Sequence, residues 1–187
     1  MEEEEERPRR KQPEARKRPR KISPRYLENS ALHYLKRYSS TVSQLRRVML
    51  RKINRSLREH GGDKLQAVQW LDALAEKLVR NGLLNDQAYA ETKTHSLRNA
   101  GRSTRVIAMK LRMKGVSAEL VTQQLDQATR ALSEDDAAKI WARKKRLGPF
   151  RRDVSTRKDL RQKDLASLAR AGFSFGIAKK VIDGTAD

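Results

Sequence analysis

The three histidines of this 187-residue chain are the first side chains to consider for metal binding or proton transfer. They are His33, His60 and His95, and no two of them are four residues apart or beside a carboxylate cluster with metal-site spacing. The pair Gly61-Gly62 lacks the Lys-Ser or Lys-Thr that completes a phosphate-binding P-loop. The sequence therefore predicts no metal site, no cofactor and no enzymatic active site.

Cysteine is absent, which excludes disulfides, thiolate nucleophiles and Cys-ligated zinc and fits a reducing compartment. No apolar run approaches the ~20 residues that span a bilayer. The chain begins with an acidic block, Glu2 to Glu6, and not with a basic end followed by an apolar stretch. We expect a cytoplasmic protein with no membrane contact.

Positive charge is the dominant chemical feature of the sequence. The 43 Lys and Arg residues against 23 Asp and Glu give a net charge of +20, which attracts phosphate polyanions or an acidic protein surface. Only 37% of the residues are hydrophobic and 5% aromatic, so the core must be thin and distributed. A compact single-core enzyme is therefore disfavoured.

Two groups of basic residues are predicted to bind the partner, through phosphate oxygens or acidic side chains. The first group comprises Arg98, Arg102, Arg105, Lys110, Arg112 and Lys114. The second comprises Arg143, Lys144, Lys145, Arg146, Arg157, Lys158, Arg161 and Lys163. For any one of them a solvated helix face is the alternative. Trp70 and Trp141 are expected in the core, because they occur at helical spacing among leucines or isoleucine, and base stacking is their alternative role.

Residues 1–24 are predicted to be a disordered arm, because they hold charge blocks and prolines but few apolar side chains. The basic residues of the arm are Arg9, Arg10, Lys11, Arg16, Lys17, Arg18, Arg20 and Lys21. The acidic block either folds back on them or leaves them free for phosphate, and a plain solvated tail is a further possibility. We expect removal of the arm to leave the fold intact and to lower the affinity for DNA.

From residue 26 onward the apolar residues recur at helical spacing and almost never alternate as in a strand, which predicts an all-α protein of nine helices. Glycines and capping residues mark the ends of these helices. The third helix is expected to end at Gly82, the fifth to run between Ser103 and Gly115, and the eighth to end at Gly172. Ser133 begins a capping box that starts the seventh.

A repeated motif divides the chain into three parts. Gly115-Val116-Ser117 recurs as Gly172-Phe173-Ser174, with Leu111 and Leu168 four residues before the glycines. In the first third, residues 54–64 are inserted before the next helix. We predict three tandem three-helix, helix-turn-helix-like units over residues 25–84, 85–132 and 133–187, in an elongated, curved arrangement.

The order of these motifs resembles the family of the regulatory protein RecX, over about residues 26–183. The motifs are Leu45-Arg46-Arg47, Gly82-Leu83-Leu84-Asn85-Asp86 before Tyr89-Ala90, then Arg105, Ile107, Leu111, Lys114-Gly115-Val116, and finally Leu168 with Gly172-Phe173. The chain departs from the pattern in two places. The first unit lacks the helix-ending glycine, and Asp164 stands where the repeat predicts an apolar residue.

The resemblance implies an elongated modulator of the RecA recombinase that docks in the groove of the RecA filament on DNA. It further implies that binding limits filament growth, strand exchange and ATPase activity, within homologous recombination and the SOS response. The expected partners are the RecA filament and single- or double-stranded DNA, and the protein is expected to be a monomer. The alternative is a direct DNA- or RNA-binding helical protein that acts through phosphate contacts.

Overall fold

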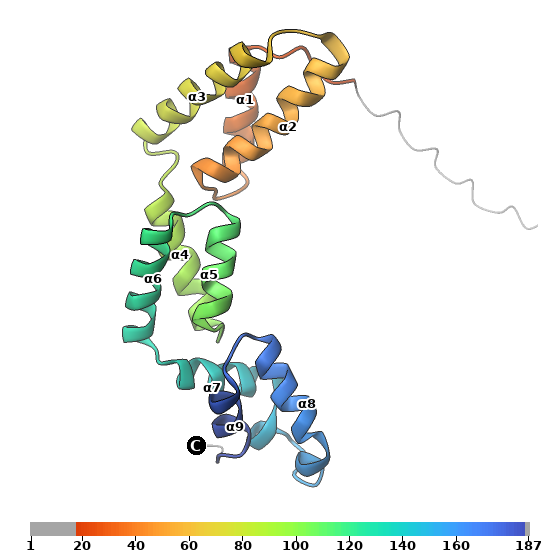
Figure 1. Ribbon diagram of the computed structural model, residues 1–187, viewed down its shortest axis with the longest axis vertical. Helices are drawn as coiled ribbons and strands as arrows, with labels where there is room; N and C mark the ends of the chain where they lie inside the picture. Colours follow the sequence, from red (N-terminus) through yellow and green to blue (C-terminus); the bar gives the residue numbers. More distant parts are fainter. Residues whose placement is uncertain (1–17, 186–187) are drawn as a thin grey trace, which may run out of the picture.

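The computed structural model describes residues 18–185, which form nine α-helices and one short 3₁₀ helix and contain no strand. The helices follow one another in three groups along one long, bent axis (Figure 1), so the predicted all-α, elongated architecture is confirmed. They are α1 (Pro24–Leu35), α2 (Val42–His60), α3 (Lys64–Arg80), α4 (Asp86–Asn99), α5 (Thr104–Met113), α6 (Ala118–Ala131), α7 (Glu134–Lys145), η1 (Gly148–Phe150), α8 (Arg157–Arg170) and α9 (Phe175–Ile182).

The capping residues expected from the sequence end and begin these helices. The Ser103 and Ser133 hydroxyls accept hydrogen bonds from backbone N–H groups three residues later, at the starts of α5 and α7. Gly115 and Gly172 follow the ends of α5 and α8 with φ of +78° and +91°. Because side chains rarely adopt this left-handed conformation, glycine is the residue that suits both turns.

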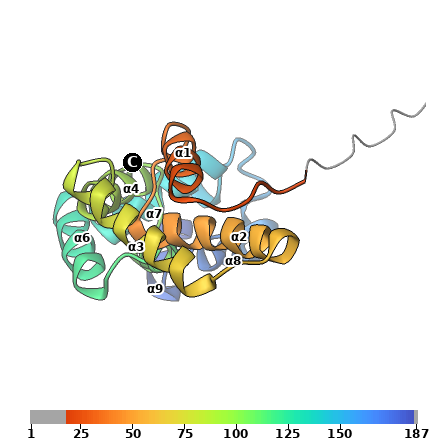
Figure 2. The same ribbon diagram turned by 90° about the horizontal axis from the view of Figure 1, so that it is seen from above.

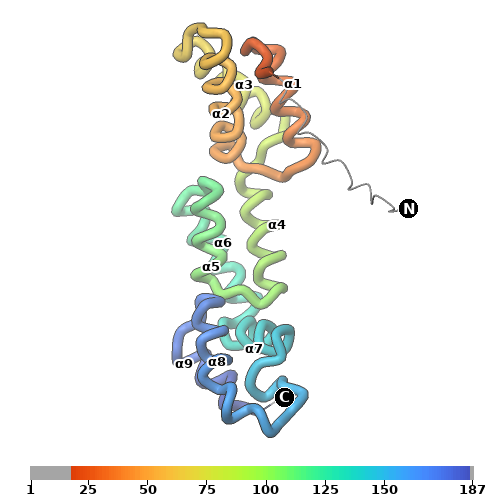
Figure 3. Tube along the Cα trace, turned by 90° about the vertical axis from the view of Figure 1, so that its right-hand side faces the viewer, coloured from red at the N-terminus to blue at the C-terminus, as the bar shows by residue number. Residues whose placement is uncertain are grey.

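Each group of three helices encloses its own small hydrophobic core, and the groups are stacked in a row (Figure 3). Leu45 and Leu71 are fully buried in the first group, Ile107 and Leu111 in the second, and Leu168 in the third. The two tryptophans are half-buried and pack against the first and third cores, as expected. A thin core is thus divided into three instead of being gathered in one.

Helix α2 is longer than its counterparts in the other two groups, because the inserted residues continue it. Residues 54–60 are helical, Ser56 is buried, and Leu57 packs against the first core. The helix ends only at His60, and Asp63 then caps α3 by accepting a hydrogen bond from Leu65 N (2.7 Å). No glycine or proline interrupts residues 54–60, so the insertion lengthens the helix rather than forming a separate loop.

The boundary of the N-terminal arm, predicted at residue 24, lies too late in the chain. Pro24 is the first residue of α1, the Ser23 hydroxyl accepts a hydrogen bond from Tyr26 N (3.2 Å), and Ile22 packs against the first core. Further back, Pro19 O lies 2.7 Å from Nε2 of His60. Figure 2 shows this stretch running from α1 toward the end of α2. Of the arm's basic residues, Arg9, Arg10, Lys11, Arg16 and Lys17 lie outside the described residues, and Arg18, Arg20 and Lys21 are exposed.

The first two groups meet at a contact that we call joint one, where the start of α2 faces the end of α5. The Thr41 hydroxyl, which caps α2, also donates a hydrogen bond to Lys114 O. The N–H of Val42 donates to Oδ1 of Asp86, the first residue of α4 (2.9 Å). A Cβ on Gly115 would overlap Ser43.

The second and third groups meet at joint two, which uses the same positions. The Ser103 hydroxyl caps α5 and donates to Ala171 O (2.9 Å), and the N–H of Thr104 donates to Oε1 of Glu134, the first residue of α7 (2.7 Å). A Cβ on Gly172 would overlap Ser103. The repeated glycine is therefore required by the joint as well as by its φ, and the starts of α2 and α5 meet the ends of α5 and α8 respectively.

Candidate partner-binding surface

Arg98, which the sequence placed in the binding group, is instead buried inside joint two, with a side chain 3% exposed. Its Nε and Nη2 donate to Leu132 O (3.2 and 2.6 Å), and its Nη1 donates to Arg102 O and to Oε1 of Glu134 (both 3.1 Å). A buried guanidinium requires such complete pairing. Contrary to the prediction, this side chain is structural and is not part of an exposed surface.

The other basic residues of the first group lie on and beside α5, a helix with no acidic residue. Arg105 and Arg112 are exposed, stand two turns apart on one face, and have no carboxylate partner within residues 18–185. Lys110 and Lys114 are half-buried. Arg102 lies over the ring of Trp141 at 4.1 Å, a cation–π contact that helps to hold joint two. Arg105 and Arg112 are therefore the freest cations of this group.

Four residues of the second group gather at the end of α7. Lys144, Lys145 and Arg146 are exposed, and Arg143 lies over the ring of Phe150 at 5.0 Å. Cations at a helix C-terminus interact favourably with the helix dipole, so this cluster also stabilises α7. Arg146 itself adopts a left-handed conformation (φ +54°) as the residue that ends the helix.

The remaining residues of the second group lie on α8 and differ in how far they are committed to internal contacts. Arg157 Nη2 donates to Pro149 O (2.6 Å), and Arg161 binds Asp183 through two hydrogen bonds of 2.7 Å each. These bonds raise the pKa of Arg161 and lower the pKa of the Asp183 carboxyl. Lys158 and Lys163 are exposed, so they are the α8 cations most open to a partner.

Asp164, the polar residue at an expected apolar position, is buried and fully paired. Its Oδ2 accepts from Gly148 N and Arg151 Nε (both 2.8 Å), and its Oδ1 accepts from Arg151 Nη2 (2.5 Å). The hydrogen bonds from this carboxylate raise the pKa of Arg151. The departure from the apolar pattern thus ties the η1 turn to α8 by a charge-assisted pair.

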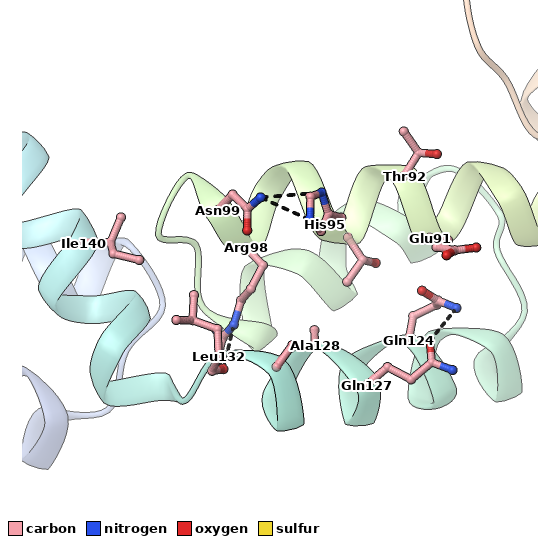
Figure 4. Close-up of a pocket in the computed structure, with 12 residues that line it drawn as sticks. Glu91, Thr92, His95, Arg98, Asn99, Gln124, Gln127, Ala128, Leu132 and Ile140 are labelled. Carbon is pink, nitrogen blue, oxygen red and sulfur yellow. Dashed lines mark hydrogen bonds between the residues drawn. The ribbon is translucent and has the colours of Figure 1, made fainter.

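A groove of about 730 Å³ lies between α4 and α6 and reaches the start of α7 (Figure 4). His95 and Asn99 of α4 face Gln124 and Gln127 of α6 across it. The one cation in its lining is Arg98, whose donors are occupied within joint two. The lining also contains the carboxylate of Glu91 and apolar side chains such as Leu132 and Ile140, so the groove is not part of the basic surface.

A further set of basic residues, which was not among those predicted from the sequence, follows the exposed side of α2. We call Arg47, Arg51, Arg55 and Arg58 the α2 arginine row, and all four are exposed. Their spacing of four, four and three residues places them along one helix face. That spacing is the sequence signal that identifies the row.

Two further observations concern the described residues, 18–185. No group of three or more His, Cys, Asp or Glu side chains there could hold a metal ion. None of the helices in this range is long and apolar enough to cross a membrane.

Comparison with known proteins points to one family. The model of the second three-helix domain of RecX matches residues 85–125. The regulatory protein RecX of Myxococcus xanthus (strain DK1622) is 67% identical over 167 residues, which cover 89% of this chain and 89% of that protein. The regulatory protein RecX of Agrobacterium fabrum is 33% identical over 162 residues, 87% of this chain and 84% of the relative.

Two crystal structures share the fold. A regulatory protein RecX aligns with a TM-score of 0.57 over 86% of this chain and 72% of that chain. RecX from Lactobacillus salivarius aligns with a TM-score of 0.58 over 86% and 94%. Both are 23% identical to this chain, so they support the architecture alone.

Proposed function

The chain belongs to the RecX family of regulatory proteins, and from this premise we propose that it regulates DNA repair and recombination by binding the RecA filament on DNA. Binding limits filament growth, strand exchange and the ATPase activity of RecA. The protein acts by occupying a surface and performs no catalysis of its own.

The observation that carries this proposal is the row of three units, which presents cations that have no carboxylate partner within residues 18–185 at separate points along its length. Arg105 and Arg112 lie on the middle unit, and Lys144, Lys158 and Lys163 on the last. When binding units are joined by short connections, the binding of one unit holds the next close to its own site and so raises its effective concentration there. A row of this kind is suited to contacting neighbouring protomers of a filament at once.

The alternative is a direct DNA- or RNA-binding helical protein that acts through phosphate contacts, and end-on insertion of α2 or α5 into a major groove is the less well supported way for it to bind. A recognition helix reads base edges with its N-terminal residues. The N-termini of α2 and α5 are occupied in the two joints, by Lys114 O at Thr41 and by Ala171 O at Ser103. These two helices therefore cannot enter a major groove end-on while the row is intact.

The test is the DNA-dependent ATP hydrolysis and strand exchange of RecA, with this protein titrated at amounts too small to coat the DNA. Inhibition is expected, and the variant R105Q/R112Q should weaken it relative to R152Q/R170Q, a control that removes two exposed arginines elsewhere. Binding to bare DNA is measured beside it. No effect on RecA together with tight, salt-sensitive DNA binding would favour the nucleic-acid-binding alternative.

A further inference from the structure

The α2 arginine row aligns four positive charges on one helix face, of which Arg47 donates a hydrogen bond to Met113 O at 3.3 Å. Arg51, Arg55 and Arg58 have no carboxylate partner within residues 18–185. Arg46, one residue before the row, is by contrast paired with Asp72 at 2.5 Å. Like charges three and four residues apart destabilise a helix, so this arrangement lowers the stability of the free protein.

Two hollows lie beside the row and share Arg55. The larger, about 620 Å³, is lined by Arg51, Asn54, Arg55, Leu57, Arg58 and Lys64. The smaller, about 290 Å³, is lined by Arg18, Pro19, Arg20, Tyr26, Lys52 and Arg55. Neither lining contains a carboxylate. A concave surface lined by one sign of charge concentrates the field and favours an anion there.

The dimensions of the row fit a nucleic-acid strand lying alongside α2. Arg47 and Arg58 are about 16 Å apart along the helix axis at a rise of 1.5 Å per residue. Each strand of a duplex advances about 3.4 Å per phosphate along the helix axis, and an unpaired strand is more extended, so the row is long enough to meet several successive phosphates. Since the N-terminus of α2 is buried in joint one, the strand must run beside the helix.

An aromatic ring next to the row indicates a single strand with accessible bases. Tyr26 is half-buried, lines the smaller hollow, and lies 5.7 Å from the ammonium group of Lys52. Unpaired bases stack on aromatic side chains within positively charged grooves, whereas the bases of a duplex are already stacked.

We propose that the α2 arginine row binds the phosphate backbone of a single nucleic-acid strand, with Tyr26 stacking on one of its bases. The site lies on the first unit, away from the residues assigned above to RecA binding. It acts on bare single strands and does not depend on the proposed action on RecA.

The test is the binding of the full chain to a fluorescent oligothymidine, measured by fluorescence anisotropy. The salt concentration is varied from about 0.05 to about 0.3 M, because the affinity of phosphate contacts falls steeply over this range. The variant R51Q/R55Q/R58Q is compared with R130Q/R152Q/R170Q, which loses the same three charges from exposed sites outside the row. Three lost contacts should lower the slope of log K against log salt by about 2 and weaken binding by roughly tenfold to a hundredfold at 0.1 M salt. The control should change little.

The same experiments also test whether the variants fold and whether single-stranded nucleic acid is preferred over duplex DNA. Because like charges are removed, R51Q/R55Q/R58Q should keep its helical circular dichroism and melt no lower than the parent. Tyr26→Leu should weaken oligothymidine binding roughly fivefold or more and duplex binding less. Equal losses in the row variant and the control, or a loss confined to duplex DNA, would overturn the proposal. RecA inhibition, assayed separately, fails or succeeds independently of this result.

Discussion

The two joints use the same backbone positions but differ in the side chains that surround them. In each, an N-cap hydroxyl donates to a helix-ending carbonyl of the next unit, and an acidic residue accepts from the first N–H of the capped helix. In joint two the acidic residue, Glu134, also holds the buried Arg98. In joint one Asp86 has no cation partner among residues 18–185, and the added contact is an exposed one, from Arg47 to Met113 O at 3.3 Å.

The contacts that set how the three units are arranged therefore differ from those that make the arrangement stiff. The repeated hydroxyl, glycine and acid set how one unit sits on the next. Joint two is costlier to open, because opening it breaks the charge-assisted hydrogen bond between Arg98 and Glu134 in addition to the contacts that joint one also has. We expect the chain to bend at joint one, so that the first unit, which carries the α2 arginine row, moves relative to the rest. The second and third units should form a rigid pair.

The largest effect is expected from Arg98→Met. The substitution removes the donor of Leu132 O and Arg102 O and the cation that pairs with Glu134, which keeps only the Thr104 N–H, so the free energy of unfolding should fall by about 3–5 kcal/mol. Denaturant unfolding followed by circular dichroism measures it. Arg130→Met, at an exposed cation of α6, should stay within about 0.5 kcal/mol of the parent. A loss below about 1 kcal/mol at Arg98 would remove the distinction between the joints.

The glycines of the joints come next. Gly115→Ala and Gly172→Ala combine a left-handed φ with a Cβ that overlaps a serine of the preceding unit, Ser43 and Ser103 respectively, whereas Gly82→Ala has φ of +70° and open space around it. Gly82→Ala should lower stability by about 1–2 kcal/mol, and the joint variants should lose at least about 1 kcal/mol more. Equal losses at all three positions, measured by denaturant unfolding, would mean that the joints are not closely packed.

The acidic residues of the two joints give a smaller and more direct comparison. Glu134→Gln weakens a charged pair with Arg98 as well as the bond from Thr104 N, so a loss of about 1.5–3 kcal/mol is expected. Asp86→Asn keeps an acceptor for Val42 N and should lose less than about 1 kcal/mol. Thermal melting of both variants measures the difference, and the reverse order would show that joint one is the stiffer.

Local signals in the sequence were enough to predict the helices and the repeat. Glycine and serine at the ends of α5 and α8 act on their own backbone neighbours, and the apolar spacing reports the buried face directly. The role of Arg98 was not accessible in the same way, because a buried arginine on α4 has the same sequence appearance as an exposed one. Its partners, Leu132 O and Glu134, are brought to it only by the packing of α7.

The candidate surface shows the same limit. Arg105 and Arg112 were correctly placed on an exposed face, although their role in binding stays a prediction. The side chains of Arg157 and Arg161 already donate hydrogen bonds to Pro149 O and to Asp183. These partners lie outside α8, so the spacing of residues along the helix could not predict them. The α2 arginine row, in contrast, was visible in the sequence as a spacing of four, four and three residues.

The smallest effect is expected from the exposed pair of Arg161 and Asp183, which serves as the reference for the buried pair in joint two. The Arg161 hydrogen bonds lower the pKa of Asp183 below its ordinary value of 3.8, so the folded state prefers the carboxylate. The stability from this pair is therefore fully present above the ordinary pKa and is lost as the pH falls through the lowered one. Asp183→Asn should cost less than about 1 kcal/mol at pH 7, because both side chains are more than a third exposed. The difference from the parent, measured by urea unfolding, should vanish on acidification, and a difference that persisted at low pH would show that Asp183 acts through packing and not through charge.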